Sequence, residues 1–167
     1  EALSAYKAAK KTETEYLKNQ LKTNELLYKK PGLKILIASH SYVEMDAYIG
    51  KPVVNYLRKM DAVPIYADNV DRHDALKQSV KVSPTLKWEF SKEIVGSIQL
   101  NHNKIDGIVL LSVFPCGPDS MVNDMIIRKF HGIPILNIVL DDQDGTAGLE
   151  TRLESFIDIL KFKGGNL

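Results

Sequence analysis

The chain has 167 residues, enough for one domain with a sizeable core, or for such a domain with an appendage. Its 22 basic and 21 acidic residues leave a net charge of +1 and form no basic stripe with interleaved aromatic residues, which argues against a nucleic-acid partner. No apolar run is long enough to cross a membrane and no secretory signal is present, so no membrane partner is expected. The single cysteine, Cys116, excludes an internal disulfide and fits a reducing, cytoplasmic environment.

A long helix is predicted over Glu1–Tyr28, ending at Pro31-Gly32. Its apolar residues share one broken stripe: Leu3, Tyr6, Leu17, Leu21 and Tyr28. A helix of this length spans about 40 Å, more than a small domain needs. It either packs against the sheet or connects to a surface outside this sequence. Because the chain starts at Glu1 rather than Met, we expect a piece of a longer or processed protein, and divide it into a connector helix, residues 1–30, and an α/β domain, residues 31–167.

Four short, β-branched runs predict strands. They are Leu33–Ala38, Ala62–Ala67, Gly107–Val113 and Ile133–Leu140. Helical patterns alternate with these strands. The first starts at Gly50 and has the apolar residues Val53, Val54, Leu57 and Met60, and a short one follows over Asp71–Val80. The others are Thr85–His102, with an apolar stripe of Leu86, Phe90, Ile94 and Ile98, a helix through Met121, Met125 and Ile126, and one over about Thr146–Lys161. This alternation is typical of an α/β three-layer sandwich. Right-handed crossovers and one reversal of winding predict a parallel four-stranded sheet of order 2-1-3-4, flavodoxin-like.

Ligands of open α/β sheets bind beyond the carboxyl ends of the strands. Four predicted loops share that edge: the polar-aromatic loop His40–Tyr48, Asp68-Asn69, Pro115–Asp119 and the acidic loop Asp141–Gly145, with Trp88-Glu89 nearby. Cys116 lies in the third loop, before a helix whose first turn suits Pro118 and Asp119. A thiol at a helix N-terminus is biased toward thiolate, so we predict a pKa below about 8.5 for Cys116.

Other chemistry has weaker support. His40 could be functional or could simply bond a loop carbonyl. A nucleophile set of Cys116, His40 and Asp46 is geometrically possible, but no protease signature accompanies it. The acidic side chains Asp141, Asp142 and Asp144 resemble a hard-cation site only loosely, and capping with solvated charge is the favoured interpretation. P-loop, GxGxxG and HExxH motifs are absent.

Three motifs in combination carry a family resemblance: DAYIGKP from Asp46, FPCGPDS from Phe114 and DDQDGTAGLETRLESF from Asp141. Over about Leu33–Leu160 the chain resembles the 2-hydroxyacyl-CoA dehydratase superfamily, and in particular the dehydratase-like part of CoA-substrate-specific enzyme activases. The resemblance implies anaerobic, oxygen-sensitive proteins with iron–sulfur clusters, such as 4Fe–4S, held by cysteines from separate segments. It also implies an ATP-hydrolysing activator that passes single electrons, and, in the dehydratases proper, removal of water from 2-hydroxyacyl-CoA.

The resemblance also implies roles for particular residues. Cys116 is the implied metal ligand, with Gly117, Pro118 and Asp119 around the cofactor. The candidate catalytic residues are His40 and Asp46, from their place at the carboxyl edge of the sheet, with Glu150 and Arg152, which belong to the motif beside the acidic loop. A cubane cluster needs about four ligands, whereas this chain has one cysteine, and Gln143 stands where relatives often have His. ATP-binding motifs are absent as well.

We therefore expect a C-terminal α/β domain that contributes one cluster ligand and part of the active-site crevice to a larger protein, and that is inactive alone, with no cofactor when isolated. Its expected partners are the part of the parent protein with the other cysteines and an ATP-dependent activator domain; a CoA ester is left open. The alternative from another class is a non-catalytic flavodoxin-like module that binds a ligand or a partner at the same edge.

Overall fold

The strands form a parallel sheet, as predicted. In residues 1–141 and 146–164, which the computed structural model describes, one four-stranded sheet has the order β2-β1-β3-β4. Its strands are β1 (Lys34–Ala38), β2 (Val63–Tyr66), β3 (Gly107–Val113) and β4 (Ile135–Leu140). The sheet order and the α/β class predicted from the sequence are both confirmed.

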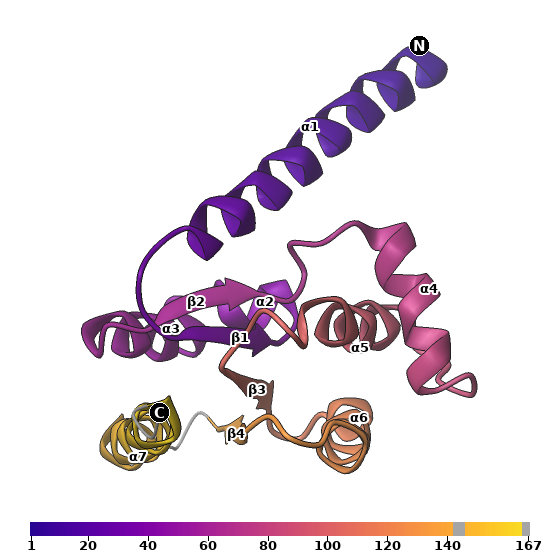
Figure 1. Ribbon diagram of the computed structural model, residues 1–167. Helices are drawn as coiled ribbons and strands as arrows, with labels where there is room; N and C mark the ends of the chain where they lie inside the picture. The colour runs from indigo at the N-terminus through magenta and orange to yellow at the C-terminus, as the bar shows by residue number, and fades with distance from the viewer. Residues whose placement is uncertain (142–145, 165–167) are drawn as a thin grey trace.

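Helices cover both faces of this sheet (Figure 1). They are α1 (Ala2–Tyr28), α2 (Ser41–Glu44), α3 (Gly50–Lys59), α4 (Arg72–Val82), α5 (Glu89–Asn101), α6 (Gly117–Lys129) and α7 (Thr146–Gly164). The helices α3 and α7 pack on one face, whereas α5 and α6 pack on the other, with α4 outside α5. Three layers result, with the strands in the middle.

The central strands are mostly apolar because both of their faces are buried. In β1, Ile35 and Ile37 join the core under α3 and α7, whereas Leu36 and Ala38 join the core under α5 and α6. Alternate residues of β3 divide between the two cores in the same way. This is why their sequence shows a continuous hydrophobic run rather than an alternating one.

The helix α5 starts later than predicted. The sequence suggested a helix from Thr85, but Ser83–Trp88 forms the turn between α4 and α5, and α5 begins at Glu89. The two helices pack so closely that a Cβ atom at Gly96 would collide with the carbonyl of Ala75. Phe90, predicted to be in the core stripe, lies in the first turn of α5 and is 70% exposed.

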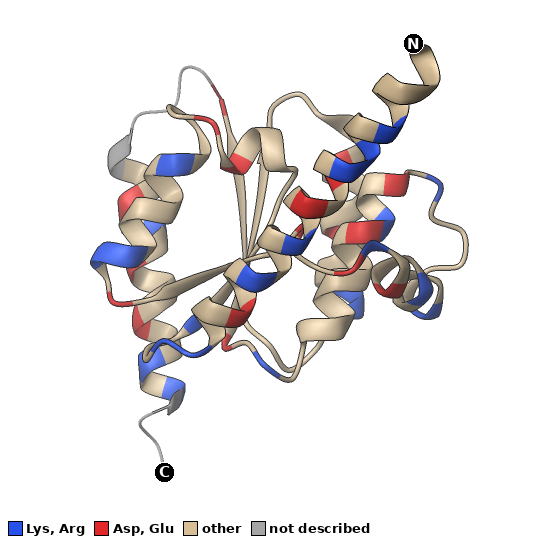
Figure 2. Ribbon diagram, turned by 90° about the horizontal axis from the view of Figure 1, so that it is seen from above, with Lys and Arg blue, Asp and Glu red and all other residues tan. Residues whose placement is uncertain are grey.

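The helix α1 packs on the domain through its second half only. Its Asn24 side chain is buried and bonds the edge strand β2: Nδ2 donates to the carbonyl oxygens of Tyr66 (2.7 Å) and Asn69 (3.0 Å), and Oδ1 accepts from the Tyr66 N–H (3.1 Å). The first half projects beyond the body of the molecule, with Leu3 67% and Tyr6 63% exposed (Figure 1). Acidic and basic residues are interspersed along it (Figure 2).

Candidate functional site

The sheet order itself creates a crevice. The winding reverses between β1 and β3, so their carboxyl ends flank the topological switch point where such folds bind ligands. The chain leaves β1 through Ser39 into His40, and it leaves β3 through a cis Phe114-Pro115 bond into Cys116. Two residues that are 76 positions apart in the sequence (40 and 116) are thereby brought to one place.

The segment after β1 is not the long loop that the sequence predicted. It contains the helical turn α2, in which the N–H groups of Val43 and Glu44 donate to the His40 carbonyl at 2.9 and 3.1 Å. The turn sends neighbouring side chains in opposite directions: Tyr42 is 68% exposed, whereas Glu44 is only 2% exposed. An acidic side chain thus enters the protein interior beside the crevice.

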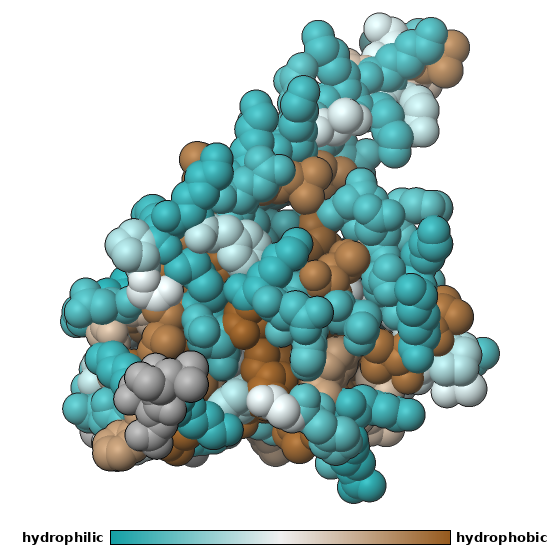
Figure 3. Space-filling model, in the orientation of Figure 1, coloured by the Kyte–Doolittle hydropathy of each residue, from teal (hydrophilic) through white to brown (hydrophobic). Residues whose placement is uncertain are grey.

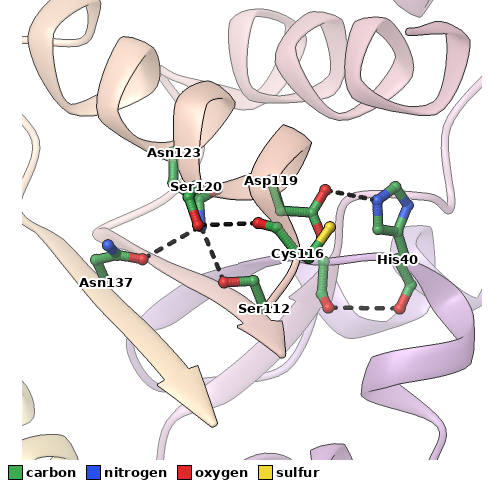
Figure 4. A network of polar contacts seen from close by, with 8 residues as sticks. His40, Ser112, Cys116, Asp119, Ser120, Asn123 and Asn137 are labelled. Atoms are coloured by element: carbon green, nitrogen blue, oxygen red, sulfur yellow. Dashed lines mark hydrogen bonds and ion pairs between the residues drawn. The ribbon is translucent and has the colours of Figure 1, made fainter. Parts of the chain in front are cut away.

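His40 is held by contacts on several sides. Its Nε2 lies 2.9 Å from Oδ1 of Asp119, which belongs to the first turn of α6, and the two side chains are only 14% and 11% exposed (Figure 4). The imidazole stacks on Tyr42 with ring centroids 5.2 Å apart, and Phe90 approaches it edge-on at 5.9 Å. The pair can exchange a proton or, with His40 protonated, form an ion pair across the switch point.

Cys116 is the N-cap residue of α6. Its N–H donates to the Val113 carbonyl at 2.9 Å, and its own carbonyl accepts from the N–H and hydroxyl of Ser120. The prediction of a lowered thiol pKa was wrong. Burial raises the pKa of Cys116, and the Asp119 carboxylate beside the thiol raises it further through a hydrogen bond and through its charge. The Asp119 N–H at the helix start acts in the opposite direction but is outweighed.

Polar side chains beneath α6 fix this helix to the sheet. Nδ2 of Asn123 donates to the Ser112 hydroxyl on β3 at 3.4 Å and to Oδ1 of Asn137 on β4 at 3.2 Å (Figure 4). Because Asn123 and Ser112 are almost fully buried, these bonds resist displacement by water. The first turn of α6, with Cys116 and Asp119, is therefore anchored from below.

Besides the His40–Asp119 pair, a pair of carboxyl groups lies next to the crevice. The Glu44 and Asp68 carboxyl groups are close enough to share a hydrogen bond, and no other donor of the described residues reaches Glu44 Oε2 or Asp68 Oδ1. Two carboxyl groups bond only when one keeps its proton. Burial, together with the charge and hydrogen bond of Asp68, raises the pKa of Glu44 to about 9, so Glu44 holds that proton.

A cavity opens beside His40, under α1. Its volume is about 280 Å³, and its walls come from α1, the Ser39–Tyr42 segment, the end of β2 and the first turns of α5. Sequence reasoning placed Asp68 at this edge because it follows a strand, but it missed Glu44 and Phe90. Glu44 had no signal beyond its place in a polar segment, and Phe90 matched a core stripe that begins one turn later in the structure.

The remaining predicted residues make other contacts. Oδ1 of Asp46 accepts from the N–H groups of Tyr48 (2.8 Å) and Ile49 (2.9 Å), so its carboxylate closes a turn. In the nucleophile set of Cys116, His40 and Asp46, Asp46 would have to bond His40, but Asp119 makes that bond instead. The Arg152 guanidinium donates to the Asn137 carbonyl of β4, and Glu150 is exposed. Gly117 and Pro118 are exposed at the start of α6.

The acidic-loop predictions at Asp142, Gln143, Asp144 and Gly145 lie outside the described residues. Within the described part of the chain, no group of three or more His, Cys, Asp or Glu side chains is placed to hold a metal ion. Searched over the same residues, none of the helices combines the length and apolar character needed to span a membrane. In comparisons with known proteins, no protein-family model and no curated protein matches this sequence.

Proposed function

We propose that this chain is the α/β domain of a 2-hydroxyacyl-CoA dehydratase-like protein, of the kind found in CoA-substrate-specific enzyme activases, and that Cys116 is one ligand of its iron–sulfur cluster. The observation that carries the proposal is the position of the Cys116 thiol, partly exposed at the switch point after β3. The FPCGPDS resemblance adds to it, since it falls on this turn.

The described residues do not by themselves form a cluster site. They offer a single thiol, whereas a cubane cluster takes about four ligands. The Asp119 carboxylate beside the thiol is already bonded to His40. The proposal therefore requires cysteines from other segments of the parent protein to complete the cluster, and we assign to this domain the one thiol and the surface around it.

The surroundings of Cys116 suit a ligand that binds under proton control. A thiol binds iron only after it loses its proton, and the buried Asp119 carboxylate works against that loss. His40 offsets part of the carboxylate's charge when it is protonated. In this proposal, His40 and Asp119 set the charge beside Cys116 and hold the first turn of α6 in place.

The alternative is a non-catalytic module that binds a small ligand at the same edge of the sheet. The observation that favours it is the cavity under α1, which approaches the lower end of the size range of small-molecule pockets. Under this alternative Cys116 is a partly buried thiol without a metal.

Iron and acid-labile sulfide content separates the two functions. The full-length protein, purified without oxygen, is expected to carry both, and Cys116→Ser should lose most of the iron. Ser155→Ala, which removes an exposed hydroxyl from α7, is the control and should retain it. A full-length protein without iron, or a Cys116→Ser variant with the wild-type iron content, would refute the cluster assignment.

Residues 1–167 alone supply the complementary test. Reconstitution with iron and sulfide under nitrogen is expected to give no stoichiometric, brown, EPR-active species, because the chain has one cysteine. A stoichiometric cluster on a monomer would contradict the proposal that other segments complete the ligand set. If a cluster formed on a dimer instead, loss of that cluster in the Cys116→Ser variant would show that the two chains share it through their Cys116 thiols.

A further inference from the structure

The cavity under α1 has a composition of its own. Its lining includes Tyr16 and Leu17 of α1, together with Tyr42 and Phe90. Where α1 meets the body of the molecule, hydrophobic side chains are framed by hydrophilic ones (Figure 3). A volume of about 280 Å³ is sufficient for a molecule with a single ring or a short chain.

Acidic groups outnumber basic ones around the cavity. Asp68 and Glu93 line it, none of the described lining residues is Lys or Arg, and the imidazole of the lining His40 is bonded to Asp119. Glu93 is already paired with Arg72, whose Nε lies 2.6 Å from its Oε1. Among the described residues no basic side chain pairs with Asp68, and its neighbour Glu44 donates a hydrogen bond to it without contributing a positive charge. The wall therefore carries an uncompensated negative charge that disfavours anionic ligands.

Aromatic rings at the mouth of the cavity are accessible. Tyr16, Tyr42 and Phe90 are 56%, 68% and 70% exposed, large fractions for aromatic side chains. The face of Tyr42 that is turned to His40 is covered by stacking, and the Phe90 ring stands perpendicular to the imidazole. Rings of this kind attract cations within about 6 Å of their centroids.

We propose that this cavity binds a small organic cation: an ammonium group carried on an apolar or aromatic body. Its ammonium group lies toward the Asp68 carboxylate, and its apolar part contacts Phe90 and Tyr42. This site does not depend on Cys116, so it stands or falls separately from the iron–sulfur proposal.

Three ligands of one shape and different charge test the proposal: benzylamine, benzyl alcohol and benzoate. Calorimetric titration of the wild-type protein near neutral pH should give a Kd for benzylamine at least about tenfold lower than that for benzyl alcohol, with benzoate weaker than both. Equal affinities, tighter binding of benzoate or no saturable binding of benzylamine would overturn the proposal. This comparison needs no variant, so a folding defect cannot obscure it.

Substitutions then locate the charge that is recognised. Asp68→Asn removes the negative charge but keeps an oxygen that accepts the Glu44 proton, and it should bring the benzylamine and benzyl alcohol affinities within about threefold of one another. Phe90→Leu should weaken benzylamine severalfold without unfolding the protein, because Phe90 is mostly exposed. Asp158→Asn, on the exposed side of α7, is the matched control and should keep the wild-type ratio. An unchanged ratio in folded Asp68→Asn would exclude Asp68 as the recognised charge.

Discussion

Glu44 offers the sharpest test of the electrostatics, because its carboxyl group is 2% exposed and its pKa is raised to about 9 from an ordinary value of 4.5. Between these two values the unfolded chain has released the proton while the folded protein keeps it. Folding therefore takes up a proton, and the free energy of unfolding falls as pH rises, by at most about 1.4 kcal/mol per pH unit. Above about pH 9 both states are ionised and the loss is complete.

The substitution Glu44→Gln removes this proton while its amide can still donate to Asp68. Between about pH 6 and about pH 8 we expect the difference in free energy of unfolding, Glu44→Gln minus wild type, to increase by about 3 kcal/mol, because only the wild type loses this contribution. Urea denaturation at several pH values, monitored by far-UV circular dichroism, measures this difference. Contributions of all other titrating groups are common to both proteins and drop out of it. Glu25→Gln, exposed on α1, is the control and should run parallel to the wild type. Parallel curves for Glu44→Gln would show that Glu44 is ionised in the folded protein and would refute the reasoning.

Three further predictions concern the thiol, the sheet edge and the long helix. Because burial and Asp119 raise the pKa of Cys116, the rate of its alkylation by iodoacetamide should inflect above about pH 8.5. Asp119→Asn should move this inflection to lower pH, and an inflection below about pH 8 in the wild type would contradict the prediction. Asn24→Ala removes the acceptor of the buried Tyr66 N–H and one donor to each of the Tyr66 and Asn69 carbonyls, and it should lower the free energy of unfolding by about 1–3 kcal/mol. Exposed Lys22→Ala should change it little, and equal effects would argue against the bonds. Hydrogen exchange should be far faster over residues 2–15 of α1 than in β1 or β3, and equal protection would mean that this half is covered.

The sheet could be predicted from the sequence because its signals are local. Each strand is a short apolar run, and the alternation with helices fixes the winding. The convergence of His40 and Cys116 followed from the same topology. What escaped prediction depends on side-chain direction: the α2 turn buries Glu44 and exposes Tyr42, and no periodic pattern in a four-residue helix records this.

The thiol was mispredicted for a related reason. A helix N-terminus favours thiolate, and the sequence shows that the helix begins near Pro118. The sequence does not show how deeply the sulfur is buried or that the Asp119 carboxylate turns back toward it. Two effects with opposite signs act on one group, and only the packed structure decides which is larger.

The two outer strands of the sheet are protected from other chains by side chains rather than by further strands. On β2, Asn24 mimics a neighbouring backbone, offering both a donor and an acceptor to Tyr66, and on β4 the Arg152 guanidinium covers the Asn137 carbonyl. Unprotected edges recruit strands from other molecules. The helix α1 is therefore more than an extension of the domain: we expect proteolytic removal of residues 1–30 to open β2 to intermolecular strand addition and so to promote self-association.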